Sequence, residues 1–206
     1  MLEFNALVLD LDGVVNWRIP AQKAGVPFLG HPQRPEDLLK PVPILPAQRE
    51  SLDGKISPII VYEAIRHSIP PVFPDVARVI RGLDEKFIYG ATGRYNNEAM
   101  IASTVLSLTW AKIFSKFDDI YFRPTGYTTV QSKVAAIADI RKQFYENEII
   151  VVDDNPEDLI PEAVTFPNIS FLLIRDFTTN RLLRGINLST IPNVRVVSTL
   201  RAGILN

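Results

Sequence analysis

The residues of this sequence that could carry out chemistry are acids that directly follow apolar runs. Asp10 and Asp12 follow the run 6–9, and Asp153 and Asp154 follow the run 149–152. Several carboxylates in one crevice repel each other, so that some would stay protonated unless a cation neutralised them. Carboxylate oxygens favour hard cations such as Mg²⁺. The chain has no cysteine, and its two histidines lie outside these motifs, which argues against zinc.

The same stretches supply the other parts that phosphoryl transfer needs. A carboxylate such as Asp10 can attack phosphorus and form an aspartyl phosphate, which divides one difficult step into two easier ones. A second carboxylate two residues on, Asp12, can protonate the leaving oxygen and later deprotonate water. A hydroxyl and an ammonium group can bind the phosphoryl oxygens, and Thr92 and Lys133 provide them.

These residues meet only if the apolar runs are neighbouring strands. Six runs predict strands, at residues 6–9, 87–89, 120–122, 149–152, 169–174 and 194–197. Runs this apolar are typical of parallel strands that are covered on both faces. Helical patterns lie between them, at residues 74–83, 96–108 and 132–144. The alternation predicts an α/β fold with an open, doubly wound, mostly parallel sheet, whose strands present Asp10, Thr92 and Asp154 at their carboxyl ends.

Residues 16–73 interrupt this alternation. Ten of the 16 prolines fall in this stretch, which is too long for a plain connection in a compact domain. One helix within it is well signalled, because Ser57 suits an N-cap, Pro58 suits the first helical position and Pro70 ends the helix. The prediction is a core of residues 1–15 and 74–206, with residues 16–73 as a small proline-rich cap or insertion.

Composition limits the partners of the chain. The formal net charge of −1 provides no long-range basic field, so we expect no nucleic acid partner. No apolar run approaches the roughly 20 residues that span a bilayer, and the N-terminus lacks the basic region of a signal peptide. The absence of cysteine suits a reducing cytoplasm. We therefore expect a cytoplasmic protein that acts on a small phosphorylated molecule, and the sequence predicts no oligomeric state.

In combination, the motifs resemble those of the haloacid dehalogenase-like (HAD) superfamily. Residues 7–15 resemble its first motif, which implies that Asp10 is the nucleophile and a metal ligand. It also implies that Asp12 is the general acid and base, with a backbone carbonyl that binds the metal. Residues 87–93 resemble the second motif, which implies that Thr92 and Gly93 bind phosphate. Lys133 is similar to the lysine of the third motif, which also binds phosphate.

Residues 149–158 resemble the fourth motif of the superfamily, two acids followed by a third four residues later. This implies that Asp154 binds the metal directly, that Asp153 binds it through water, and that Asp158 supports both from behind. The resemblance covers residues 1–15 and about 74–206, and it does not reach the insertion. It implies a Rossmann-like core and a Mg²⁺-dependent phosphatase that cleaves a phosphate monoester of a small metabolite.

Other functions stay open at this point. A dehalogenase of the same superfamily is one alternative, although halide displacement needs neither an acid at Asp12 nor a metal. A phospho-receiver signalling domain uses similar residues, but its lysine comes last, whereas Lys133 precedes Asp153 and Asp154. A phosphotransferase and a catalytically inactive binding protein on the same fold are further alternatives, since a fold alone decides no function.

The same residues also have plain structural interpretations. Residues 153–156 could simply cap the next helix, and Lys133 could be a solvated helix residue. Arg94 directly follows the Thr92-Gly93 pair and is expected to be solvated rather than to reach the site. Trp17 and Trp110 are expected to be packing residues.

Overall fold

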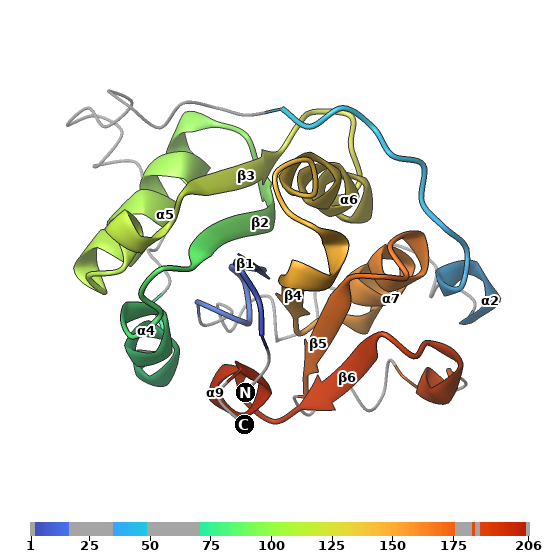
Figure 1. The fold of residues 1–206 in the computed structure, drawn as a ribbon. Helices are drawn as coiled ribbons and strands as arrows, with labels where there is room; N and C mark the ends of the chain where they lie inside the picture. Colours follow the sequence, from blue (N-terminus) through green and yellow to red (C-terminus); the bar gives the residue numbers. More distant parts are fainter. Residues whose placement is uncertain (1–2, 17–34, 49–70, 176–182, 184–185, 205–206) are drawn as a thin grey trace.

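Six parallel strands form one sheet at the centre of the molecule (Figure 1). The structure, a computed structural model, describes residues 3–16, 35–48, 71–175, 183 and 186–204. The strands are β1 (Ala6–Leu9), β2 (Phe87–Tyr95), β3 (Asp119–Arg123), β4 (Ile149–Asp153), β5 (Ser170–Ile174) and β6 (Val194–Val197). Their order across the sheet is β3-β2-β1-β4-β5-β6, and every pairing is parallel. The predicted α/β fold with a doubly wound sheet is confirmed.

Helices cover both faces of the sheet. On one face lie α4 (Pro74–Arg81), α5 (Glu98–Trp110) and α9 (Leu200–Ile204), and on the other lie α6 (Thr129–Ile140) and α7 (Pro156–Thr165), next to the short α2 (Pro35–Leu38) (Figure 1). Short 3₁₀ turns occupy Phe114–Lys116, Glu146–Glu148 and Leu188–Thr190.

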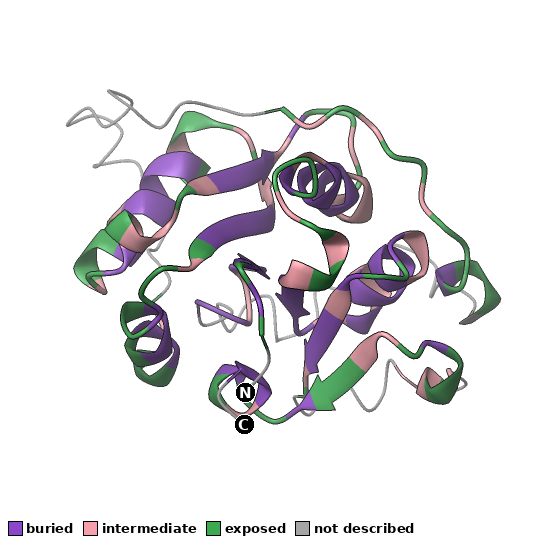
Figure 2. Cartoon of the chain, viewed as in Figure 1, coloured by how far each residue is buried: buried purple, intermediate pink, exposed green. Residues whose placement is uncertain are grey.

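The alternation of side chains along β1 and β4 divides the core into two halves. Leu7 and Leu9 of β1 pack with the α4, α5 and α9 side, whereas Ala6 and Val8 pack with α6 and α7. All four side chains are fully buried, as the purple centre of the sheet shows (Figure 2). Because successive residues of a strand point to opposite faces, Asp10 continues the row that faces α6 and α7. The same alternation along β4 places Asp153 on that face, because Ile149 and Val151 also pack there.

Local sequence signals set where the helices begin. Asn97 caps α5 by accepting a hydrogen bond from the backbone N–H of Met100. Thr128 and Gln131 form a capping box, so α6 begins at Thr129, three residues before the predicted start. Asn155 caps α7 and Pro156 occupies its first turn. The cap of α7 is thus Asn155, and the interpretation of residues 153–156 as only a helix cap does not account for Asp153 and Asp154.

Three expectations about exposure or extent are wrong. The β6 strand is an edge strand with exposed Arg195 and Val196, so it is not covered on both faces. Trp110 ends α5 with 67% of its surface exposed, so it is no packing residue. The β2 strand runs on to Tyr95, with a register shift after Ala91, so Thr92 lies within the strand rather than beyond it. Trp17 lies outside the described residues.

The insertion leaves and rejoins the core at neighbouring points. Asn16 forms a bridge with Val72, and the backbone N–H of Phe73 donates to the carbonyl of Val15. Residues 35–48 pack along the core beside α6 and α7, where Leu38 is buried and the backbone N–H of Val42 donates to Thr165 Oγ1. The predicted helix from Ser57 lies outside the described residues. Among the helices that the structure describes, none has the length and apolar character needed to cross a membrane.

Candidate active site

The carboxyl ends of β1 and β4 lie side by side at the centre of the sheet. Leu9 pairs with Val152 on β4 and with Gly90 on β2, and the backbone N–H of Asp10 donates to the carbonyl of Val152 at 2.9 Å. The register therefore places Asp10 directly beside Asp153. This is also where the strand order reverses, which is the position where open α/β sheets bind their ligands.

Three buried carboxylates gather at this point. Asp10, Asp153 and Asp154 each offer one oxygen, and these three oxygens all lie within 4.8 Å of one another. Their exposed fractions are 6%, 1% and 4%, respectively. Carboxylates this close and this poorly hydrated cannot all carry a negative charge without a compensating cation.

Lys133 supplies part of that compensation from α6. Its Nζ lies 3.1 Å from Asp10 Oδ1, 2.5 Å from Asp153 Oδ2 and 3.3 Å from Asp158 Oδ2. The side chain is only 4% exposed, so the interpretation of Lys133 as a solvated helix residue is wrong. Burial alone would lower the pKa of Lys133, but Asp10, Asp153 and Asp158 together raise it well above its usual range. The ammonium therefore stays charged, with its three donors directed at three acids.

One lysine does not neutralise the group. Burial raises the pKa of the Asp10 carboxyl well above its usual range, because Lys133 offsets only part of that effect and Asp153 and Asp154 add to it. Burial likewise raises the pKa of Asp153. The site thus offers hard oxygen donors with an excess of negative charge, and this donor set fits Mg²⁺. Asp10, Asp153 and Asp154 are the residues of this set that could hold such an ion.

Glu162 on α7 adds a fourth buried acid that sequence reasoning missed. The residue is fully buried, and neither carboxylate oxygen has a hydrogen-bond partner within the described part of the chain. Burial raises the pKa of Glu162 well above its usual range, and the nearby Lys133 offsets this only in part. Glu162 follows Asp158 by one helical turn, so it lies on the same side of α7. A carboxyl in this position is expected to be protonated.

We expect Glu162→Gln to stabilise the protein increasingly as pH rises. The raised pKa in the folded state means that folding holds a proton which the unfolded chain releases above pH 4.5, the ordinary value for glutamate. The resulting loss of folding free energy is absent below that pH and grows above it until the pKa of Glu162 in the folded state is reached. Thermal unfolding in EDTA measures the effect, because each kcal/mol of stabilisation raises the Tm of a chain of this size by about 2–4 °C. A Tm difference between variant and wild type that stays constant from mildly acidic to mildly alkaline pH would contradict it.

Arg94 of β2 binds the second acid of the first motif. Its Nε donates to Asp12 Oδ2 at 2.9 Å and its Nη2 donates to Asp12 Oδ1 at 2.5 Å. The remaining Nη1 donates to Thr104 Oγ1 on α5 at 2.6 Å. Only 8% of the Arg94 side chain is exposed, so the expectation of a solvated arginine is wrong. Arg94 thus joins β2, α5 and the loop after β1 at one edge of the site.

Thr92 and Gly93 directly precede Arg94 on β2. Thr92 is 1% exposed, and its Oγ1 accepts a hydrogen bond from the backbone N–H of Arg94 at 3.2 Å. A Cβ atom at Gly93 would lie 2.8 Å from Thr129 Cγ2, so glycine is what lets the start of α6 approach β2. This approach brings α6, and with it Lys133, up to the carboxyl ends of the strands.

Gly13 is the other glycine that the site requires. It has a φ of +100°, and a Cβ atom there would lie 2.2 Å from Asp154 Oδ2. Its backbone N–H donates to the carbonyl of Asn16 at 2.9 Å, which closes the loop after β1. Both the backbone conformation and the contact with Asp154 exclude a side chain at this position.

We expect Gly13→Ala to weaken metal binding by at least about tenfold, because the new methyl group displaces the Asp154 carboxylate. The strained φ should also lower the free energy of unfolding by at least about 1 kcal/mol. Titration calorimetry with Mg²⁺, together with urea unfolding, measures the two effects separately. Gly126→Ala is the matched control, because Gly126 also has a positive φ of +87° but has no atom near its Cβ position. If both variants bind Mg²⁺ equally well, the contact with Asp154 is unimportant.

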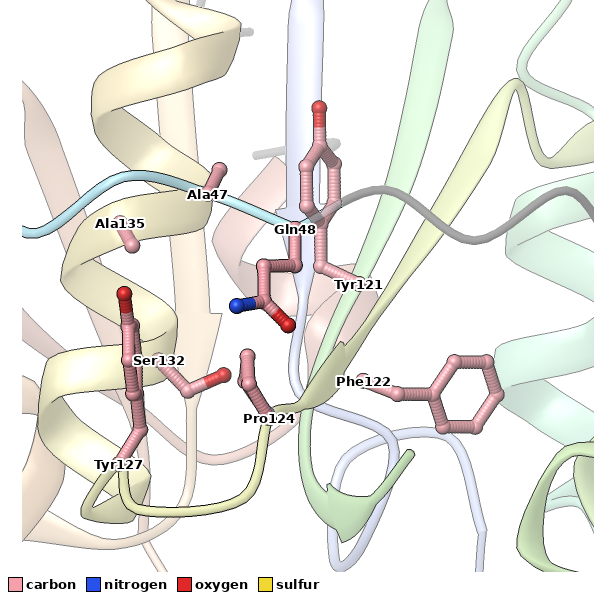
Figure 3. A pocket seen from close by; sticks show the side chains of 8 residues that line it. All are labelled: Ala47, Gln48, Tyr121, Phe122, Pro124, Tyr127, Ser132 and Ala135. Carbon is pink, nitrogen blue, oxygen red and sulfur yellow. The ribbon is translucent and has the colours of Figure 1, made fainter. Parts of the chain in front are cut away.

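A small pocket lies apart from the acids, where the described end of the insertion meets β3 and the start of α6 (Figure 3). Ala47 and Gln48 form one side of it and Tyr121, Tyr127 and Ser132 form much of the other. No acidic or basic side chain lines it. It therefore offers a few polar atoms, but no group for the chemistry considered above.

Comparison with solved structures identifies the fold. A haloacid dehalogenase-like hydrolase from Streptococcus pneumoniae is similar over 89% of this chain and 91% of its own, with 18% identity and a TM-score of 0.52. The UTR4 protein of Saccharomyces cerevisiae shares 15% identity over 84% and 91% of the two chains, with a TM-score of 0.47. L-2-haloacid dehalogenase from Xanthobacter autotrophicus shares 11% identity over 95% of this chain and 90% of its own, with a TM-score of 0.47.

No family model and no curated protein matches the sequence. The evidence for the fold is therefore structural, and it rests on the S. pneumoniae hydrolase. The chain has the haloacid dehalogenase-like fold, which the resemblance of its four motifs predicted. A fold at this level of identity does not decide which reaction the site performs.

Proposed function

We propose that this chain is a Mg²⁺-dependent phosphohydrolase, which cleaves a phosphate monoester of a small metabolite through an aspartyl phosphate on Asp10. The observation that carries the proposal is the place of Asp10. It is a buried carboxylate at the point where the strand order reverses, within 4.8 Å of two further carboxylates and 3.1 Å from Lys133. Asp12 follows it by two residues and can supply the general acid and base of a two-step transfer.

Each residue of the site has a role in this proposal. Asp10 attacks phosphorus, and Asp12 protonates the leaving oxygen and later takes a proton from water. Thr92, Gly93 and Lys133 bind the phosphoryl oxygens. Asp10, Asp154 and the Asp12 carbonyl would hold Mg²⁺ directly, Asp153 would act through water, and Asp158 would support them from behind. Phosphate and carboxylates are both negatively charged and repel each other. The bound ion would neutralise part of that charge and so allow them to come together.

The contact between Lys133 and Asp158 supports the role of Asp158. Asp158 Oδ2 also accepts a hydrogen bond from Asn155 Nδ2 at 3.0 Å, so its carboxylate is held by two partners. It can thereby help to fix the ammonium group of Lys133. This is the arrangement expected of an acid that orients the lysine rather than one that binds the metal.

A dehalogenase is the second candidate, because the same fold carries that activity in the X. autotrophicus enzyme. Three closely spaced carboxylates favour the phosphatase, since displacement of halide by a carboxylate needs no metal. The Arg94–Asp12 ion pair favours it as well, because it holds an acid two residues after the nucleophile, and halide displacement needs no acid there. A phosphotransferase would use the same groups with an alcohol in place of water.

The decisive experiment is a panel of phosphorylated metabolites and 4-nitrophenyl phosphate, assayed with Mg²⁺ and with EDTA. We expect Mg²⁺-dependent phosphate release, and no halide release from 2-haloacids under either condition. Adding small alcohols to the assay identifies a phosphotransferase by the new ester that forms. Metal-independent halide release would replace the proposal with the dehalogenase.

We further propose that residues 16–73 form an insertion that influences substrate choice, beside a core of residues 1–15 and 74–206. Support comes from its attachment, since Asn16 bridges both Asp12 and Val72. The insertion therefore begins and ends next to the acid that meets the leaving group. Replacing residues 49–69 by a short Gly/Ser linker tests this, because residues 35–48 pack on the core. An unchanged ranking of substrates would exclude the proposed role.

A further inference from the structure

The Asp12 carboxylate is held at both of its oxygens. Arg94 Nε binds Oδ2 and Arg94 Nη2 binds Oδ1, which is the paired geometry in which arginine fixes the plane of a carboxylate. Asp12 is the more exposed partner, with 28% of its side chain accessible compared with 8% for Arg94. The carboxylate thus faces the open side of the site, while the guanidinium lies behind it.

Arg94 itself is held from a third direction. Thr104 of α5 accepts from Arg94 Nη1 at 2.6 Å and donates its own hydroxyl to the carbonyl of Met100 at 2.8 Å. Thr104 is fully buried, so this contact is shielded from water. A continuous chain of hydrogen bonds therefore runs from α5 through Thr104 and Arg94 to Asp12. Its anchor is a helix that packs on the sheet rather than a loop.

We propose that Arg94, anchored by Thr104, is a positioning residue that aims the Asp12 carboxyl at the leaving-group oxygen during phosphorylation of Asp10. This rests on the proposed phosphohydrolase function. Asp12 lies in the short loop after β1, and within the described residues its side chain has no ion pair other than that with Arg94. Without the guanidinium, the side chain of Asp12 would be free to rotate away from the ester.

The proton transfer balances in both steps. In the first, Asp10 forms a bond to phosphorus as the ester P–O bond breaks, and protonated Asp12 gives its proton to the departing oxygen. An alcohol leaves, and Asp12 becomes a carboxylate. In the second, water attacks phosphorus, Asp12 takes a proton from that water, and the bond between Asp10 and phosphorus breaks.

The dependence of rate on the leaving group distinguishes positioning from other roles. A poor leaving group needs the proton from Asp12, whereas a good one departs without it, and general acid catalysis contributes about 10²–10⁴-fold. The ratio kcat/KM covers substrate binding and phosphorylation but not the later hydrolysis of the aspartyl phosphate. We expect Arg94→Ala to lower kcat/KM about 100-fold for phenyl phosphate and less than about tenfold for 2,4-dinitrophenyl phosphate. Asp12→Ala should show the same pattern.

Two further variants locate the effect in the chain of hydrogen bonds. Thr104→Val removes the anchor while keeping the shape of the side chain, so it should produce the same selectivity with a smaller loss. Arg94→Lys keeps the charge but cannot bind both oxygens, so it should recover only part of the rate on phenyl phosphate. Arg81→Lys is the matched control, because Arg81 is exposed on α4, and it should leave both substrates unaffected.

The outcomes separate this proposal from the function on which it rests. If the wild type cleaves neither aryl phosphate, the proposed function fails. If the wild type is active and Arg94→Ala lowers kcat/KM equally for both esters, Arg94 contacts the phosphoryl group or only supports the fold, and the positioning role is wrong. A rise in KM that is equal for both esters, with kcat unchanged, would overturn it too, because that result would make Arg94 a substrate-binding residue. Full recovery by Arg94→Lys would exclude the need for paired hydrogen bonds.

Discussion

Asp10→Asn should abolish turnover of 4-nitrophenyl phosphate, by at least about 10⁴-fold, while the protein stays folded. An amide at this position cannot form the acyl phosphate, and no other described carboxylate has the same place between β1, β4 and Lys133. The assay is steady-state hydrolysis with Mg²⁺, together with mass spectrometry of acid-quenched enzyme. Wild-type enzyme should carry a covalent phosphate during turnover and the variant should carry none.

The stability of the same variant provides an internal check. Because the pKa of Asp10 is raised in the folded state, folding at neutral pH must either protonate this carboxyl or bury its charge. Asparagine removes that cost, so in EDTA the Tm of Asp10→Asn should equal or exceed that of the wild type. Asp84→Asn at an exposed position is the control, with unchanged turnover. Appreciable turnover by Asp10→Asn, with phosphate still bound covalently, would remove Asp10 as the nucleophile.

The sequence is sufficient for much of the fold because apolar runs and helix caps are local signals. All six predicted strands exist, and the runs 6–9 and 194–197 coincide with β1 and β6. The convergence of Asp10 and Asp153 follows from one further step, namely that parallel strands end at the same edge of a sheet. What local patterns do not contain is the register shift in β2, which extends that strand past Thr92.

The ion pair of the site that sequence reasoning missed joins residues that are far apart in the chain. Arg94 and Asp12 are separated by 82 positions, and no local sequence pattern around either residue indicates that it pairs with the other. Lys133 did carry a signal, because the residues that follow it, Val134 to Ala138, are apolar on every side of the helix. Glu162 carried one as well, as a lone acid between Pro161 and Ala163 in an apolar stretch. Charged residues in such surroundings are buried, and buried charges have partners or perturbed pKa values.

Mg²⁺ should raise the melting temperature of the wild type and should be required for activity. An ion that binds only the folded state stabilises it by about 2.7 kcal/mol at a hundredfold excess over Kd, or about 5–10 °C for a chain of this size. The effect should be larger at pH 7.5 than at pH 5.5, because the raised pKa values of Asp10 and Asp153 mean that protons compete with the metal. Differential scanning fluorimetry with Mg²⁺ and with EDTA measures both dependences.

Asp154→Asn should lose most of this stabilisation, because it removes one of the three oxygens that lie within 4.8 Å of one another. The variant should nonetheless fold, since in EDTA the loss of one buried negative charge relieves repulsion within the group. Asp84→Asn, which removes one negative charge at an exposed position, should keep the full shift and so exclude an effect of net charge alone. A wild type that gains no stability from saturating Mg²⁺, or that hydrolyses phosphate esters equally well in EDTA, would show that the acids serve another purpose. An undiminished shift in Asp154→Asn would instead place the ion among other ligands, and the assignment of Asp154 would be wrong while the metal dependence stood.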